Sequence, residues 1–293
     1  MTFPECIILQ GGGALTMSYL NPLRLIETEA MRRSQKVVDL CKEFRGVSAG
    51  AMAAVFMTLG LSTYKIEQLC RDIFDQVLGD TIFDLETFLT QRGGKCSSIF
   101  VNIINSVIVD VLGKDFTDTT FKELHEKTGV FLRVYAAEIN CADPGTRELS
   151  HVTEPDMPVS LGVAASCAIP FIFTPVFFRG KWLVDGNTGI DTTFECTDGR
   201  PTIMLSASAN VDSAISKMSF QGYVECIINL LLSTMRKVHS AQRAKIDKLC
   251  VVNVQTDLSA KAIMGGSREN IDKIIEAGAE PEICEQLIKF LGV

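Results

Sequence analysis

Short apolar runs alternate with longer segments of helical periodicity along this chain of 293 residues. The predicted strands are 5–10, 130–139, 147–152, 176–184, 201–207 and 249–254, with a further short strand that runs into Gly46. The predicted helices are 14–33, 51–59, 63–77, 99–112, 121–128, 158–168 and 220–247, and two short helices close the chain. The interval 80–98 reads as an irregular connection, most flexible at its paired glycines. Strands that alternate with helices predict an α/β fold whose mainly parallel sheet is covered on both faces.

No linker, repeat or low-complexity segment interrupts this pattern, so we expect a single domain over residues 1–293. The chemical motifs lie within about 5–254, and 255–293 supplies C-terminal helices. One stretch, 160–178, is almost wholly apolar, but Pro170 and Pro175 lie inside it. A buried helix, a turn and a strand explain this stretch better than a membrane span does.

The most informative segment is Gly46-Val47-Ser48-Ala49-Gly50, where a short strand is followed at once by a small-residue helix. This G-x-S-x-G pattern is typical of a nucleophile elbow. The turn is so tight that side chains two residues before and after the serine would collide, and glycine at both positions removes the collision. Ser48 is then expected at a helix N-terminus, whose free N–H groups favour negative charge.

A run of three glycines, Gly11-Gly12-Gly13, follows the first predicted strand and precedes Ala14. Glycines directly after a strand leave backbone N–H groups that a ligand can approach closely, which suits an oxyanion hole or a phosphate cradle. The dinucleotide-binding pattern G-x-G-x-x-G fails because Thr16 stands at its sixth position, and no Gly-Lys-Ser/Thr of a Walker loop follows.

Two later segments complete a set of four landmarks, Ala165-Ser166-Cys167-Ala168-Ile169-Pro170 and Asp185-Gly186-Asn187. Together with the glycine run and the elbow on the second strand, their order resembles the patatin-like phospholipase family over about 5–254. The resemblance implies a three-layer α/β/α sandwich with a mainly parallel central sheet. It also implies a lipid acyl hydrolase, of the phospholipase A or lysophospholipase type, that cleaves glycerolipid or phospholipid esters with no metal or other cofactor.

The resemblance also assigns roles by position. The family's Ser–Asp dyad falls on Ser48 as the nucleophile that forms an acyl-enzyme and on Asp185 as its general base. The oxyanion hole falls on the backbone N–H groups of Gly11, Gly12, Gly13 and Ala14. These roles fit the chemistry, because a serine is a weak nucleophile until a neighbouring base takes its proton. The tetrahedral intermediate also needs preorganised donors.

The sequence departs from the family pattern at three places. Leu15 and Thr16 stand where Arg and Gly are usual, and Asn187 replaces the usual Gly or Ala. The segment 191–193 stands where the family often has an Asn-x-Pro stretch. These changes bear on the bracing of the oxyanion loop and on the hydrogen bonds of Asp185, but they remove no reacting group.

Two rival functions stay open at this point. Ser48, Asp185 and His239 occur in the chain order of a Ser-His-Asp hydrolase, but His239 lies in the middle of the predicted helix 220–247, where a solvated side chain is expected. His239→Ala separates the two mechanisms. The second rival is a catalytically silent binding or scaffold protein that keeps the fold. Retention of both Ser48 and Asp185 argues against it.

The composition argues against two kinds of binding site and indicates the cellular compartment. The net charge of −7 argues against sequence-independent nucleic-acid binding. Ten cysteines without a C-x-x-C pair, and only three histidines, argue against a zinc site. With no signal peptide visible, we expect an intracellular protein, cytoplasmic or peripheral to membranes and not secreted.

Two groups of side chains suggest contact with lipid. The basic residues Arg236, Lys237, Arg243, Lys245 and Lys248 suit either an anionic lipid surface or an ordinary solvated helix face, and we favour the solvated face. The aromatic residues Phe171, Phe173, Phe177 and Phe178 suit an acyl pocket, with core packing expected for at least half of them.

Overall fold

The centre of the protein is a mainly parallel β-sheet. The computed structural model describes residues 3–78, 85–189, 199–209, 248–256 and 268–292. The sheet runs in the order β10-β9-β1-β2-β4-β8-β7, with β5 also paired to β4. Its strands are β1 (Cys6–Leu9), β2 (Glu43–Val47), β4 (Phe131–Glu138), β5 (Gly145–Leu149), β7 (Val176–Phe178), β8 (Lys181–Asp185), β9 (Thr202–Ala209) and β10 (Leu249–Thr256). The neighbouring strands from β10 to β4 are parallel, whereas β5, β7 and β8 pair antiparallel.

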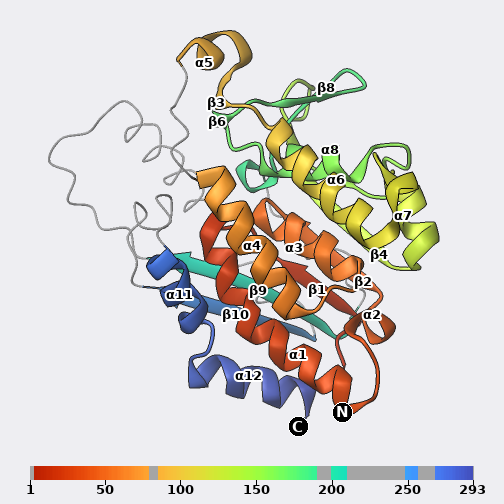
Figure 1. Cartoon of the computed structure of the whole chain (residues 1–293), viewed down its shortest axis with the longest axis vertical. Helices are drawn as coiled ribbons and strands as arrows, with labels where there is room; N and C mark the ends of the chain where they lie inside the picture. The colour runs from red at the N-terminus through yellow and green to blue at the C-terminus, as the bar shows by residue number, and fades with distance from the viewer. Residues whose placement is uncertain (1–2, 79–84, 190–198, 210–247, 257–267, 293) are drawn as a thin grey trace, which may run out of the picture.

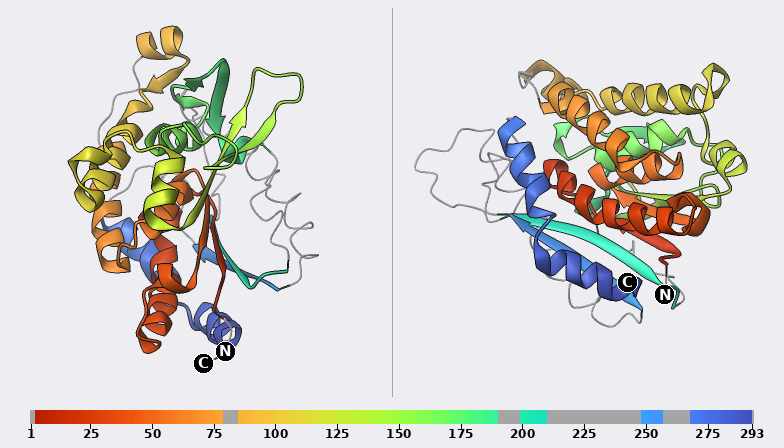
Figure 2. Two further views of the ribbon diagram at one scale, coloured as in Figure 1. Left: turned by 90° about the vertical axis from the view of Figure 1, so that its right-hand side faces the viewer. Right: turned by 60° about the horizontal axis from the view of Figure 1, so that its bottom comes forward.

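Most of the helices lie on one face of this sheet, as Figure 1 and the left view of Figure 2 show, whereas α5 lies beyond the sheet at the top of Figure 1. The described helices are α1 (Leu20–Arg32), α2 (Val37–Leu40), α3 (Ala49–Thr58), α4 (Thr63–Leu78), α5 (Leu85–Gln91), α6 (Ser98–Leu112), α7 (Phe121–Thr128), α8 (Val159–Cys167), α11 (Arg268–Ala277) and α12 (Pro281–Leu291). Helix α3 is buried on nearly all sides, which explains its small apolar residues. The mixed α/β fold with a mainly parallel central sheet is confirmed, and the helix predicted at 220–247 lies outside the described residues.

Two predictions about local structure were wrong. The interval predicted as irregular contains α5 and a short strand, β3 (Gly93–Lys95), which pairs in parallel with β6 (Phe171–Phe173). Gly93 is tightly packed, because a Cβ there would lie 2.3 Å from the carbonyl carbon of Phe173. Strand β5 begins and ends earlier than predicted, because the Ser150 and Thr153 side chains form a turn after Leu149. The first error arises from pairing between distant segments, which local sequence does not encode, whereas the second arises from hydrogen bonds within the turn itself.

The predicted helix 14–33 is divided in two. Its first part is the 3-10 helix η1 (Gly13–Tyr19), and α1 follows directly. Pro22 lies in the first turn of α1, where its missing N–H costs no hydrogen bond. Two further short 3-10 segments are η2 (Lys114–Phe116) and η3 (Gly186–Thr188).

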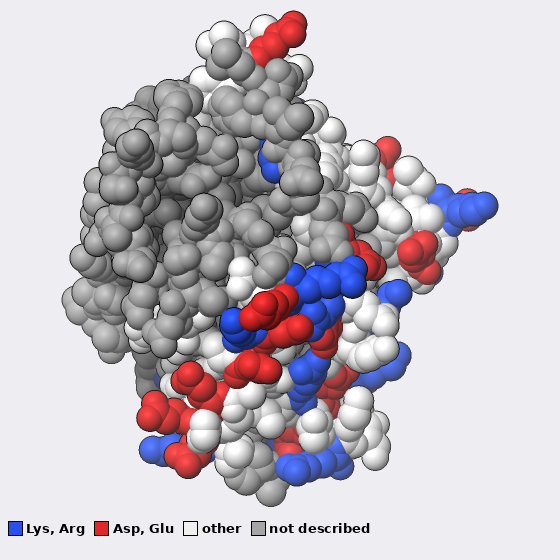
Figure 3. Space-filling model, turned by 60° about the vertical axis from the view of Figure 1, so that its left-hand side comes forward, with Lys and Arg blue, Asp and Glu red and all other residues white. Residues whose placement is uncertain are grey.

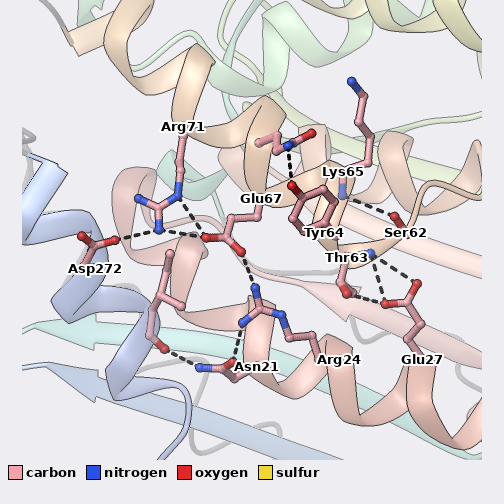
Figure 4. Close-up of polar contacts among 12 residues, drawn as sticks. Asn21, Arg24, Glu27, Ser62, Thr63, Tyr64, Lys65, Glu67, Arg71 and Asp272 are labelled. Carbon is pink, nitrogen blue, oxygen red and sulfur yellow. Dashed lines mark hydrogen bonds and ion pairs between the residues drawn. The ribbon is translucent and has the colours of Figure 1, made fainter.

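The C-terminal helices pack on the same hydrophobic core as the rest of the described chain. Ile274 of α11 and Leu287 of α12 are fully buried in it. Figure 4 shows the polar contacts that accompany this packing: Arg71 of α4 bridges Glu67 and Asp272, at 2.7 Å from the latter. Exposed ion pairs of this kind contribute little individually, so the buried apolar contacts hold α11 and α12 in place.

Charged side chains of both signs are interspersed on the face shown in Figure 3, over the part that the structure describes. Over this described part, the mixture gives no extended field of one sign. Among the described helices, none has the length and apolar character needed to cross a membrane.

Candidate active site

The elbow at Ser48 is a strained turn between β2 and α3. Ser48 has φ 56° and ψ −133°, a conformation that is costly for a residue with a side chain. A Cβ on Gly46 would lie 2.4 Å from the carbonyl oxygen of Gly50, and a Cβ on Gly50 would lie 2.1 Å from that of Leu9. Both positions therefore require glycine, one because the elbow folds back on itself and the other because it presses on β1.

A buried serine that the sequence did not single out for a role holds this strained turn. The backbone N–H of Ser48 donates to Oγ of Ser166 at 2.8 Å, and that hydroxyl donates to the carbonyl oxygen of Tyr135 at 2.6 Å. Ser166 lies on α8 and is fully buried. The landmark around it marked the segment, but only the fold shows that its hydroxyl joins the elbow to β4.

Asp185 occupies the last position of β8 and is 2% exposed. Its backbone is paired with Ala136 of β4, and its N–H donates to the carbonyl oxygen of Ala168 at 2.9 Å. Oδ1 accepts a hydrogen bond from the N–H of Asn187 at 2.8 Å. Oδ2 is buried, and no donor among the described residues meets it. The backbone is thus fixed on both sides, while one carboxylate oxygen stays unpaired.

Burial raises the pKa of Asp185 from 3.8 to about 6, although hydrogen bonding from Ser48 and Asn187 lowers it in part. The Ser48 hydroxyl is thus near enough to affect the carboxyl, yet it does not complete a hydrogen bond to Oδ2. Such contacts are often long until substrate is bound. A carboxyl with this pKa is mostly ionised at neutral pH and is still basic enough to take up a proton.

The glycine run lies against Ser48 and against Asn187, the residue that bonds to Asp185. A Cβ built on Gly11 would lie 2.0 Å from Nδ2 of Asn187 and 2.7 Å from Cβ of Ser48. In the described chain, no acceptor is found for the N–H of Gly11 or Gly12. The next N–H groups, of Gly13 and Ala14, open η1, where the first turn of a helix leaves donors unpaired. Free donors therefore lie beside the serine.

The two unusual residues after the glycines brace this loop from within. Leu15 is buried in the core, and the Thr16 hydroxyl donates to the carbonyl oxygen of Gly13 at 2.8 Å. The Tyr19 hydroxyl donates to the carbonyl oxygen of Gln10 at 3.0 Å. The loop is therefore held without the arginine that usually follows the glycines.

The other candidate residues lie either outside the described part of the chain or away from this cluster. His239 and the basic residues 236–245 lie outside the described part of the chain. The two described histidines, His125 and His151, stack on each other beside Phe131 at the end of β4 farthest from the elbow. No group of three His, Cys, Asp or Glu side chains among the described residues is placed to hold a metal ion.

The four phenylalanines divide into two pairs. Phe173 is buried and Phe178 is half-buried against the core. Phe171 and Phe177 are exposed, at 49% and 55%. The expectation that at least half of them pack in the core agrees with this placement.

Known proteins resemble this chain in sequence. R571, an uncharacterized protein of Acanthamoeba polyphaga mimivirus, is 23% identical over 261 residues, which cover 86% of this chain and 84% of that protein. The probable lipid hydrolase 463L of Invertebrate iridescent virus 6 is 26% identical over 189 residues. That match covers 62% of this chain and 59% of the viral protein, so it spans less than two thirds of its length.

Solved structures share the fold. VipD from Legionella pneumophila superposes with a TM-score of 0.62 at 14% identity, over 99% of this chain and 67% of VipD. The type III effector ExoU gives a TM-score of 0.53 at 12% identity, over 99% of this chain and 53% of ExoU. The sequence profile of the patatin-like phospholipases matches residues 7–191, which include the glycine run, the elbow and the Asp-Gly turn. Because this match spans more than half of its length, the chain belongs to the patatin-like phospholipase family.

Proposed function

We propose that the protein is a lipid acyl hydrolase in which Ser48 attacks the ester and Asp185 acts as its general base. One observation carries the proposal: a serine on a strained strand-to-helix turn lies beside a buried carboxyl whose pKa is raised to about 6. Perturbed titratable groups next to a nucleophile are characteristic of catalytic sites. Membership of a phospholipase family supports an acyl ester as the substrate.

The reaction proceeds in two halves. In the first, Oγ of Ser48 bonds to the carbonyl carbon of the ester while its proton passes to Asp185. The oxyanion is stabilised by N–H groups of the glycine run, from Gly11 to Ala14. Collapse of the intermediate breaks the ester bond, and the leaving alcohol takes the proton from Asp185. In the second half, water attacks the acyl-enzyme, Asp185 accepts its proton, and the carboxylic acid leaves as the proton returns to Ser48.

The substrate class is glycerolipid or phospholipid, met at a membrane or other lipid surface. The name of the viral relative, a probable lipid hydrolase, supports this class. The exposed rings of Phe171 and Phe177 belong to β6 and β7, and the chain leads from β6 through β7 directly to the strand that ends at Asp185. An apolar surface so near to the base along the chain suits approach to lipid.

The test is covalent labelling with a fluorophosphonate probe in the presence of detergent or vesicles. We expect wild-type protein to be labelled, Ser48→Ala to show no labelling, and Asp185→Asn to react far more slowly. Ser98→Ala, which removes an exposed serine on α6, is the matched control and is expected to label as wild type does. A panel of phospholipid, lysophospholipid and neutral lipid then identifies the ester that is cleaved.

The same experiment separates the rival functions. Loss of labelling in His239→Ala would favour a Ser-His-Asp mechanism over the dyad. Folded wild-type protein that stays unlabelled with vesicles present would overturn the proposal in favour of a silent binding protein.

A further inference from the structure

Asn187 is the residue that brings the three parts of the proposed site together. It follows Asp185 by two positions in the 3-10 turn η3, and its backbone N–H donates to Oδ1 of that residue at 2.8 Å. Its side-chain amide lies on Gly11, because a Cβ there would meet Nδ2 at 2.0 Å. The same built Cβ would lie 2.7 Å from Cβ of Ser48. Nδ2 of Asn187 and Cβ of Ser48 are therefore close neighbours across Gly11.

We propose that Asn187 is a positioning residue of the dyad: its side-chain amide, which lies against Gly11, presents N–H donors toward the Asp185 carboxylate and favours the ionised form of this base beside Ser48. The inference rests on the proposed function, and it gives the side chain of Asn187 a role in addition to that of its backbone N–H. An amide Nδ2 carries two N–H donors and no acceptor, so it favours a carboxylate over a neutral carboxyl.

Among the described residues, hydrogen bonds are the interactions that favour the ionised form of Asp185. Burial is the main influence on its pKa, and the groups that lower it are the Ser48 side chain and the N–H and side chain of Asn187. A titratable neighbour from another described element is Cys167 of α8, whose own pKa is raised by burial and by the charge of Asp185. Among the described residues no cation contributes, in contrast to the usual pairing of a buried carboxylate with Arg or Lys.

The test is the pH dependence of fluorophosphonate labelling in wild type, Asn187→Ala and Asn187→Asp. In wild type, the rate should rise with pH to a plateau, with its midpoint near the Asp185 pKa of about 6. Loss of a donor to the carboxylate disfavours its charged form, so the midpoint of Asn187→Ala should move upward by about one pH unit. That move lowers the rate at pH 6 about fivefold and the rate at pH 8 by only about a tenth.

Asn187→Asp keeps the size of the side chain but places a second carboxyl beside Asp185. Because like charges oppose ionisation, its midpoint should move further upward than that of Asn187→Ala. The matched control is Asn140→Ala. Asn140 donates to the carbonyl oxygen of Gly180 and accepts from the N–H of Trp182, so it supports the same hairpin at its other end. Its loss should leave the midpoint unchanged even where it slows labelling.

The outcomes are distinct. An upward midpoint in both Asn187 variants, with the plateau rate kept, supports the proposal. A lower plateau with an unmoved midpoint assigns Asn187 a purely structural role and overturns it. If Asn187→Ala fails to fold, Asn187→Leu, which keeps the size of the side chain and removes the amide without adding a charge, decides the question through its midpoint. Absence of labelling in wild type refutes the proposed function itself, whereas labelled wild type with unmoved midpoints refutes only the role of Asn187.

Discussion

Asp185→Asn should make the folded protein more stable at neutral pH while it removes the reactivity of Ser48. The reason lies in the burial of the carboxyl, which raises its pKa from 3.8 to about 6. The folded state therefore binds this proton more tightly than the unfolded state does. Stability from this group is fully present below about pH 4 and is lost as the pH rises to about 6.

The size of the effect follows from the same two values. The folded and unfolded pKa values differ by roughly 2.2 units, at about 1.36 kcal/mol each. At pH 8 the buried, ionised carboxylate therefore lowers the free energy of unfolding by about 3 kcal/mol. At pH 5 the wild-type carboxyl is largely protonated when folded, and the cost falls to about 1.6 kcal/mol. Asparagine carries no charge at either pH, so it relieves this cost and the gain should shrink as the pH falls.

Urea unfolding followed by circular dichroism measures this difference, since the free energy of unfolding falls linearly with denaturant. Asp156→Asn is the matched control, because Asp156 is exposed and, among the described residues, its carboxylate contacts only Arg179, in an ion pair. The same chemical change there should alter stability by less than about 0.5 kcal/mol. An Asp185→Asn protein that is no more stable than wild type at pH 8, or whose gain does not shrink toward pH 5, would refute this reasoning.

Two further predictions concern other parts of the chain. Gly278→Ala places a Cβ 2.0 Å from the carbonyl oxygen of Ser18 in η1, so both the fluorophosphonate labelling rate and the urea midpoint should fall. Gly292→Ala, which strains only the left-handed end of α12, should lower stability without slowing labelling, and equal labelling losses in both variants would contradict this. Burial and the charge of the stacked His125 lower the pKa of His151 in the folded protein. As the pH falls, the unfolded chain therefore protonates His151 before the folded protein does, and the free energy of unfolding should decrease from pH 7.5 to 5.5. His151→Phe should reduce that fall in urea titrations, and an unchanged fall would contradict the assignment.

The parts of the site that the sequence could predict are those set by local geometry. A Cβ on Gly46 would collide with the elbow's own backbone at Gly50, and such a collision follows from local chain geometry. The collision that requires glycine at position 50 is with Leu9 of β1, and only the fold shows it. The alternation of strands and helices likewise predicted the mainly parallel sheet, because hydrophobic periodicity is local. Strand β3 was missed because it depends on pairing with a segment nearly 80 positions away.

The roles that sequence reasoning missed depend on contacts between elements. Ser166 looks like any small residue in a buried helix, and only its position next to Ser48 and the Tyr135 carbonyl gives its hydroxyl a purpose. Asn187 stood out as a departure from the family pattern, but the contact of its amide with Gly11 needed the fold. The raised pKa of Asp185 also follows from burial, which its neighbours in sequence do not reveal.

A two-residue mechanism makes a steric demand that a three-residue one avoids. With an imidazole between them, a serine and a carboxylate can stand on elements well apart, whereas a direct dyad needs the base's strand to approach the elbow itself. Gly186 permits that approach, because a Cβ there would lie 2.4 Å from the Tyr135 carbonyl oxygen and 2.7 Å from Cγ2 of Val47. Glycine at position 186 therefore allows the strand that carries the base to lie close to the nucleophile. In the proposed mechanism, any side chain at position 186 should slow the attack by Ser48 even though Asp185 itself is intact.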